Sequence, residues 1–124
     1  MKGNAVGKYS DKFKSYNLIE MLLLNMLSKK ESYGYEIIQF FNSLSDSEIT
    51  VATGKLYPML YRLEEEGLIS SQKKLIGKRM ERVYYHLTEV GYQELQEMIS
   101  DYQNLISITD RMLNYEYTAN SKII

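Results

Sequence analysis

The segment that decides the fold is residues 53–70, TGKLYPMLYRLEEEGLIS. Its apolar residues recur at the helical spacing i, i+3, i+4 and i+7, namely Leu56, Met59, Leu60 and Leu63. Two poor helix formers, Gly54 and Pro58, lie near its start, and three consecutive glutamates lie near its end. This charge order is the reverse of the one that the helix dipole favours. The pattern therefore predicts a helix whose polar residues serve a partner rather than helix stability.

The polar side of this helix fits the recognition helix of a helix-turn-helix, which enters the major groove by its N-terminal end. A small residue at the start permits close approach to phosphates, and Thr53 can offer a cap and a hydroxyl. The acids 64–66 lie at the far end, away from DNA. From the helical period, the residues expected to face or flank DNA are Thr53, Gly54, Lys55, Tyr57, Tyr61 and Arg62.

The remaining elements predict a complete winged helix-turn-helix. In chain order they are an apolar helix over about 11–28, a helix after Ser32 as its N-cap, strand-like runs over 68–75 and 79–87, and a long helix capped by Thr88. Gly67 ends the helix of the opening segment as a C-cap would.

We therefore expect a mainly α fold with a small β wing, a winged helix-turn-helix with an extra N-terminal helix and a long C-terminal dimerisation helix. Residues 1–87 would form the DNA-binding domain, with the first helix also in the dimer. Residues 88–124 would form the dimerisation helix and tail.

The hairpin is basic in a chain whose net charge is −1. Residues 73–82, KKLIGKRMER, hold five basic residues against one acid, whereas residues 88–117 hold six acids against one arginine. A charge run often marks only a solvated face, but such an asymmetry can give an acidic protein a basic surface. Wings reach phosphates or the minor groove, so the expected wing contacts are Lys73, Lys74, Gly77, Lys78 and Arg79.

Two helices carry more apolar surface than one small domain is expected to cover. The run 18–27 is apolar nearly all round, and the last helix has apolar residues at alternating spacings of three and four. These patterns predict a homodimer whose interface includes Leu18, Leu22, Leu95, Met98, Tyr102, Leu105 and Met112. The alternative is a last helix that packs on the core of its own domain.

The sequence lacks the residues that a catalytic site or a metal site would need. The single histidine, His86, lies on a predicted strand, and the consecutive glutamates 64–66 fan around a helix, so they form neither a catalytic pair nor a metal cage. There is no cysteine and no glycine-rich phosphate loop. We expect no catalysis, no metal and no cofactor. We also expect a cytoplasmic protein without a membrane partner, because no signal layout or bilayer-length apolar run is present.

Three strings carry a family resemblance: SYGYEII at 32–38, TGKLYPMLYRLEEEGLI at 53–69 and RVYYHLTEVG at 82–91. The chain resembles the PadR family of transcriptional regulators over about residues 15–115, and its length is similar to that of the short subfamily with one C-terminal helix. The resemblance implies a homodimeric repressor that binds a palindromic operator in double-stranded DNA. It also implies that Tyr35 and Tyr57 lie near the DNA backbone and that Gly77, Lys78 and Arg79 form the wing tip.

The resemblance further implies a regulatory site. Some short members bind flat aromatic drugs between the two subunits, stacked on a tryptophan of the last helix. This chain has no tryptophan; Tyr102 stands at the matching place, and Ile106 replaces an acid expected one turn later, which argues against cationic drugs. A slot for a small aromatic effector is expected from Met21, Asn25, Tyr102 and Leu105. The alternative is a closed interface without a slot.

The function expected from these observations is that of a sequence-specific DNA-binding repressor released by a small aromatic ligand. A second class of function is a winged-helix module that binds protein and not DNA, since the fold does not determine the function. The basic wing favours DNA, and salt-dependent binding to duplex would separate the two.

Overall fold

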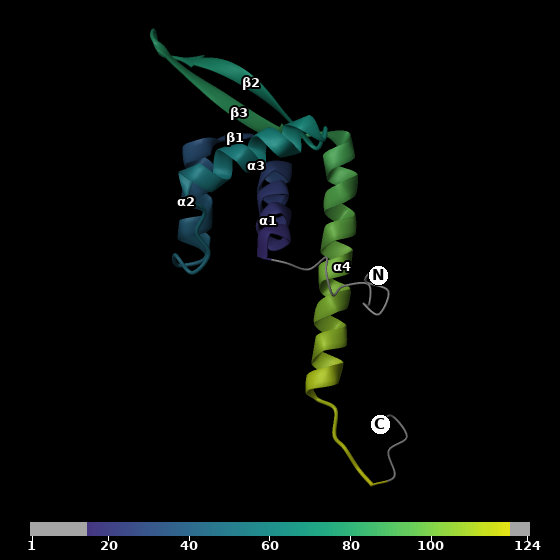
Figure 1. Ribbon diagram of the computed structural model, residues 1–124. Helices are drawn as coiled ribbons and strands as arrows, with labels where there is room; N and C mark the ends of the chain where they lie inside the picture. Colours follow the sequence, from purple (N-terminus) through teal and green to yellow (C-terminus); the bar gives the residue numbers. More distant parts are fainter. Residues whose placement is uncertain (1–14, 120–124) are drawn as a thin grey trace.

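The computed structural model describes residues 15–119, which form four helices and a three-stranded antiparallel sheet. The elements are α1 (Ser15–Lys29), β1 (Ser32–Tyr33), α2 (Gly34–Leu44), α3 (Thr53–Glu65), β2 (Ile69–Ile76), β3 (Met80–Leu87) and α4 (Glu89–Leu113), as Figure 1 shows. The strand order is β1-β3-β2. This architecture confirms the prediction of a mainly helical fold with a small β wing.

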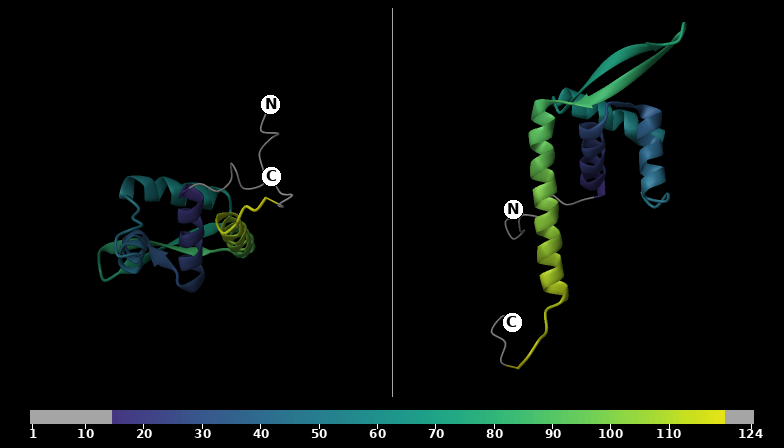
Figure 2. Two further views of the ribbon diagram at one scale, coloured as in Figure 1. Left: turned by 90° about the horizontal axis from the view of Figure 1, so that it is seen from below. Right: turned by 180° about the vertical axis from the view of Figure 1, so that it is seen from behind.

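Helix α1 is central to the molecule. Seen from below, it lies between α3 on one side and the sheet on the other (Figure 2), and α4 packs beside it. Leu23 and Leu24 are completely buried. The apolar run of α1 is thus largely covered within one chain, where a second subunit was expected to supply the cover. Of the helix expected over 11–28, residues 11–14 lie outside the described part.

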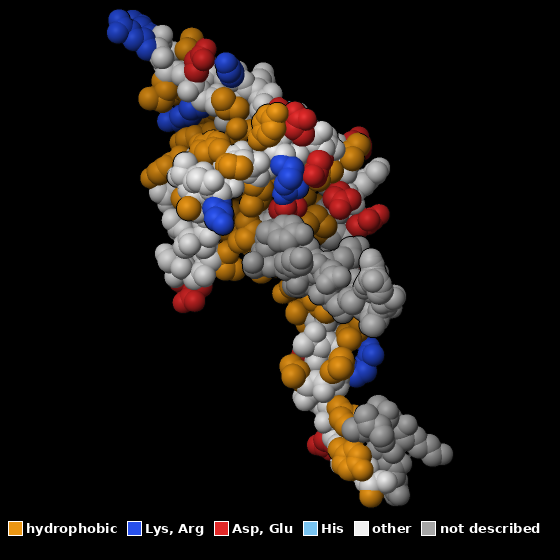
Figure 3. Space-filling view, in the orientation of Figure 1, with side chains coloured by type: hydrophobic (Ala, Val, Ile, Leu, Met, Phe, Trp, Pro, Cys, Tyr) orange, Lys and Arg blue, Asp and Glu red, His pale blue; other side chains and the backbone are white. Residues whose placement is uncertain are grey.

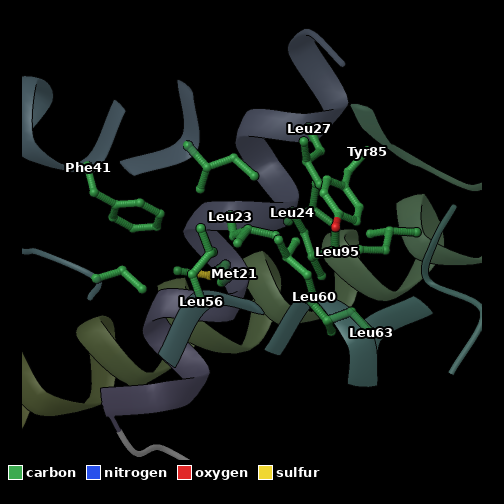
Figure 4. Packing of buried hydrophobic residues seen from close by; sticks show 13 residues of the cluster. Met21, Leu23, Leu24, Leu27, Phe41, Leu56, Leu60, Leu63, Tyr85 and Leu95 are labelled. Carbon is green, nitrogen blue, oxygen red and sulfur yellow. The ribbon is translucent and has the colours of Figure 1, made fainter. Parts of the chain in front are cut away.

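The core gathers apolar side chains from every helix and from two strands (Figure 4). Helix α3 contributes Leu56, Leu60 and Leu63, each at most 1% exposed, which confirms the periodicity of the opening segment. Each such burial contributes on the order of 1.5–3 kcal/mol. Because these three residues lie on one side of α3, the opposite side of the helix faces outward.

The two ends of α3 differ from each other in how they are capped. At the start, Ala52 occupies the N-cap position without a side-chain hydrogen bond, and Thr53 is the first helical residue, so the expected threonine cap is wrong. At the end, Gly67 adopts a φ of 79° and its N–H donates to Glu64 O at 3.0 Å. Leu68 N–H donates to Leu63 O at 3.0 Å, which completes a Schellman motif at the helix end that Gly67 was predicted to cap.

The expected cap of α2 is also wrong, because tertiary pairing extends the chain there. Ser32 and Tyr33 form β1 opposite Tyr85 and Tyr84 of β3. The hydroxyl of Ser32 donates to the carbonyl of Lys30 at 3.0 Å, and the N-cap of α2 is Tyr33. The Tyr33 N–H donates to the Glu36 carboxylate at 3.2 Å, so an acid in the first turn serves this helix end.

The hairpin and the last helix follow the sequence closely. Strands β2 and β3 pair from Ile69 with Leu87 to Ile76 with Met80, so the first strand is shifted by one residue from its prediction and the second begins one residue later. Thr88 caps α4, as expected, by accepting the Gly91 N–H at 3.0 Å. A Cβ at Gly91 would overlap the carbonyl oxygen of Leu68 and lie 2.8 Å from Leu87 Cδ1. The start of α4 therefore needs a glycine for close packing on the hairpin.

Gly91→Ala is expected to lower the thermal unfolding midpoint and to destabilise the protein by about 1–3 kcal/mol, because backbone atoms of Leu68 would have to move. Gly54→Ala is the matched control, since it is also near a helix start but nothing lies within 4 Å of its added Cβ. The control should be neutral or up to about 1 kcal/mol more stable from helix propensity. Equal midpoints for the two variants in calorimetry would contradict the packing argument.

Candidate nucleic-acid interface

The outward face of α3 carries most of the residues predicted to meet DNA. Tyr61 is 68% exposed and Tyr57 45% exposed, and Thr53, Gly54 and Lys55 are exposed beside them. Acidic side chains gather where α3 ends and α4 begins, whereas basic side chains mark the tip of the hairpin (Figure 3). The face is thus free of acids at its N-terminal end, the end by which a recognition helix enters a groove.

The acidic end of α3 has structural partners. The Ser71 hydroxyl of β2 donates to Glu64 at 2.7 Å, and Arg62 donates to Glu66 at 3.1 Å. These contacts anchor the last turn of α3 to the hairpin and to its own surface. They account for acids at a position that the helix dipole disfavours.

Tyr57 joins α3 to the start of α2. A Cβ at Gly34 would overlap the Tyr57 hydroxyl and lie 2.7 Å from Cζ of its ring. Gly34 is buried, and its lack of a side chain lets the tyrosine lie across the first turn of α2. The sequence placed both residues in one motif but did not predict that they touch.

Tyr35 lies on the first turn of α2, 59% exposed, and its hydroxyl accepts a hydrogen bond from Gln39 at 2.6 Å. Its ring stacks on Tyr33 with 6.5 Å between centroids, and Tyr33 meets Tyr84 of β3 edge-on at 5.4 Å. The Arg82 guanidinium lies 4.3 Å from the centroid of the Tyr33 ring. Tyrosines and one arginine therefore connect α2 to the base of the wing.

Arg82 was not among the predicted contacts, although it ends the basic run of the hairpin. A cation above an aromatic face contributes about 0.5–1 kcal/mol at an exposed site. The available signal was Arg82 two positions before Tyr84 on β3, but the partner ring comes from β1, a strand that the sequence did not reveal.

The charges beside α2 are paired. Lys30 donates to Glu36 at 2.8 Å. Burial acts to raise the pKa of Glu36, but the hydrogen bonds from Lys30 and from the Tyr33 N–H outweigh it and lower that pKa below its usual value. The same hydrogen bond raises the pKa of Lys30. Both groups therefore stay charged at neutral pH and fix the start of α2.

The predicted wing residues divide into two groups. Lys73, Lys78 and Arg79 are exposed, and within residues 15–119 none of them has an ion-pair partner. Gly77 has a φ of 69°, which a hairpin turn favours in glycine. Lys74 is different: it is ion-paired with Glu31 and lies 4.8 Å from the centroid of the Tyr84 ring. Lys74 thus holds the wing to the body, while the other cations extend into solvent.

Arg62 also has a structural partner, where a flanking DNA contact was expected. Its guanidinium donates to Glu20 of α1 and to Glu66. Glu20 is 8% exposed, so its carboxylate is one of the few buried charges of the described chain. Burial raises the pKa of Glu20, although Arg62 acts to lower it. The sequence showed Glu20 as a polar interruption in an apolar helix, a signal that it needs a cation, but not which one.

His86 has a structural partner as well. Its Nε2 lies 2.7 Å from the Ser70 hydroxyl across β2 and β3. Among residues 15–119 no three histidine, cysteine or acidic side chains are grouped as a metal site would require. No helix in that same range is long and apolar enough to cross a membrane.

The residues predicted for the dimer interface and the slot differ in how much of their surface is exposed. Leu95 and Met21, 1% and 7% exposed, belong to the core of their own chain, so neither has the surface that an interface or a slot wall needs. The reason is that the first half of α4 packs on α1, as the alternative interpretation held. The half-buried residues are Leu18, Leu22, Asn25, Met98, Tyr102 and Leu105, whereas Met112 is 73% exposed.

A hollow of about 320 Å³ opens elsewhere, where α1 ends and α4 begins. Its walls are Leu27, Ser28, His86, Leu87, Thr88, Glu89 and Tyr92. None of the predicted slot residues lines it.

The sequence model of the transcriptional regulator PadR-like family matches residues 23–97. The transcriptional regulator YqjI of Escherichia coli is 32% identical over 91 residues, which are 73% of this chain and 42% of that protein. The negative transcriptional regulator PadR of Bacillus subtilis is 29% identical over 86 residues, 69% of this chain and 47% of that protein. The chain thus spans less than half the length of these two relatives.

Solved structures agree with the sequence matches. A PadR-like transcriptional regulator of Bacillus cereus has a TM-score of 0.71 and 29% identity, with 82% of this chain and 96% of that chain covered. A PadR family regulator of Eggerthella lenta has a TM-score of 0.69 and 30% identity, with 82% and 86% covered. At this coverage, the likeness extends over most of the architecture described above.

Proposed function

The chain belongs to the transcriptional regulator PadR-like family, and we propose that it is a cytoplasmic homodimer that binds a palindromic operator in double-stranded DNA and represses transcription. The observation that supports this most directly is the outward face of α3, on which Lys55 and Tyr61 are exposed and whose N-terminal end lacks acids. The exposed cations at the tip of the wing add a second surface, without acidic partners in the described part of the chain.

In the proposed complex, the N-terminal end of α3 enters the major groove. Lys55 and Tyr61 would meet base edges, and Thr53 would meet a phosphate. The exposed wing cations Lys78 and Arg79 would meet phosphates of either strand irrespective of sequence. Two such helices related by a two-fold axis would read half-sites about 10 bp apart.

The proposed dimer uses the distal half of α4, which extends beyond the body of the protein (Figure 1). Its exposed apolar side chains include Ile106 (43%), Met112 (73%) and Leu113 (76%). A contiguous apolar strip on a protruding helix is typical of an interface, and a two-fold dimer would pair the strip with itself.

The proposed effector is a planar aromatic compound that binds beside Tyr102, Asn25 and Leu105, where α4 leaves α1. All three side chains are half-buried in the single chain, so each retains surface that a dimer could turn into a slot. To release the operator, the compound must bind more tightly to the protein off DNA than to the protein on DNA.

The DNA proposal is tested by selecting bound sequences from a random duplex pool and then titrating salt. Lys78→Ala combined with Arg79→Ala should weaken binding to all sequences and flatten the slope of log K against log salt by about 0.9 for each phosphate that the wing no longer neutralises. Lys55→Ala should instead alter the preferred sequence. An unchanged slope in the wing variant would refute the wing assignment, and binding without salt dependence would favour a protein-binding module.

The dimer proposal predicts a light-scattering mass of twice 14.6 kDa at micromolar protein. Ile106→Glu combined with Met112→Glu should yield a folded monomer, because two carboxylates would enter the apolar strip of each subunit. Ser107→Glu is the matched control, since the helical period turns Ser107 away from that strip. A monomeric native protein, or a dimer that survives both glutamates, would contradict the proposal.

The effector proposal predicts that a planar aromatic compound raises the unfolding midpoint and weakens operator binding in parallel. Tyr102→Ala should abolish both responses while operator affinity without the compound stays within about threefold. Tyr92→Ala, at an exposed tyrosine nearer the start of the same helix, should keep both. A full response in the Tyr102 variant would exclude this slot.

A further inference from the structure

One ion pair ties the recognition helix to the central helix. Glu20 of α1 and Arg62 of α3 are 42 positions apart in sequence and hydrogen-bonded in the structure. The carboxylate is buried, whereas the side chain of Arg62 retains 45% of its exposure and also reaches Glu66. Glu66 and Glu94 of α4 add repulsion at the same place. Charges from α1, from α4 and from the C-terminal end of α3 thus meet around one buried carboxylate.

This pair is a poor device for stability. Removing a carboxylate from water is costly, and burial is the largest single cause of the raised pKa of Glu20. Apolar residues of similar volume often stabilise a fold as well as a buried ion pair does. What the pair does supply is a fixed orientation of α3 relative to α1, because a guanidinium bonds a carboxylate only in a narrow range of geometries.

The position of Arg62 along α3 makes this orientation important for how the start of the helix is presented. Leu56, Leu60 and Leu63 fix how deep α3 lies, but apolar packing alone allows a helix to slide or rotate slightly. Arg62 lies near the C-terminal end of α3, whereas Lys55 lies near the start. A bond that holds the far end of the helix to α1 therefore sets the angle at which the first turns are presented.

We propose that Arg62 is a positioning residue for operator recognition: through its bond to Glu20 it fixes α3 against α1, and it does not itself touch DNA. The inference rests on the proposed DNA binding and deepens it. It also makes α1, which carries Asn25 five residues after Glu20, one element through which a change near α4 would reach the recognition helix.

The test compares Glu20→Gln, Arg62→Gln and the double variant with the native protein on a selected operator. Each single change is expected to weaken binding by about tenfold, a typical size for coupling between separate sites, and the double variant should be no weaker than either. The slope of affinity against salt should stay unchanged, because every cation that neutralises a phosphate is still present. The weaker binding of Glu20→Gln is diagnostic, since removing a negative charge should otherwise favour DNA.

Glu66→Gln is the matched control, because it removes the partner of Arg62 within α3 and leaves the bond to α1 intact. It should bind the operator within about twofold of the native protein, as expected for an exposed pair at i and i+4. Tighter binding by Glu20→Gln together with a flatter salt slope in Arg62→Gln would overturn the proposal, because both results belong to an arginine that contacts phosphate directly.

Hydrogen exchange of the unbound protein separates this inference from the proposed function. Glu20→Gln and Arg62→Gln should each raise the exchange of α3 amides near residues 62–66, with no further rise in the double variant. If the native protein binds no duplex, the proposed function fails, and unchanged α3 exchange would then overturn the positioning role separately. Should either single variant not fold, Glu20→Leu with Arg62→Leu removes both charges; native operator affinity in that variant would equally refute the proposal.

Discussion

The arrangement of the whole molecule depends on the burial of one stripe of α3 against α1. Leu56, Leu60 and Leu63 are almost fully removed from solvent, and the exposure of the opposite face of α3 follows from them. Gly54 and Lys55 can face a partner only because this stripe holds the helix by its other side. The Schellman turn at Gly67 then reverses the chain into β2, so the same stripe also determines where the wing begins.

The fold could be predicted from the sequence where a local pattern was sufficient. The α3 stripe, the glycine turn after it, the hairpin and the Thr88 cap all depend on residues close together in the chain. The sequence missed what depends on distant partners: β1 exists because Ser32 and Tyr33 pair with β3, and Leu95 is buried because α4 turns back along α1. For the candidate site, the exposed face of α3 and the wing cations were predictable, whereas the pairings of Lys74 and Arg62 were not.

Charge pairing explains why some cations near the interface differ in role from others of the same type. Lys74 and Arg62 are bonded to carboxylates of the body, and Arg82 lies over a tyrosine ring. In contrast, Lys78 and Arg79 extend from a turn that has no carboxylate partner within residues 15–119. The paired group holds α3 and the wing to the body, whereas the unpaired group lies in solvent, as the proposed phosphate contacts require. Counting basic residues in the sequence cannot separate these groups.

The two ends of the molecule are connected through the central helix and through the start of α4, where the Thr88 hydroxyl donates to Gly67 O at 2.6 Å. The distal half of α4 extends beyond the body, and its first half packs on α1. One path from α4 to α3 therefore runs through α1, across apolar packing and across the bond between Glu20 and Arg62. Apolar packing fixes how far apart α1 and α3 lie but tolerates small rotations of one against the other. The hydrogen-bonded ion pair is instead sensitive to the angle between the two helices. For this reason, a buried carboxylate that adds little stability can still decide how the recognition helix responds to events at the far end of α4.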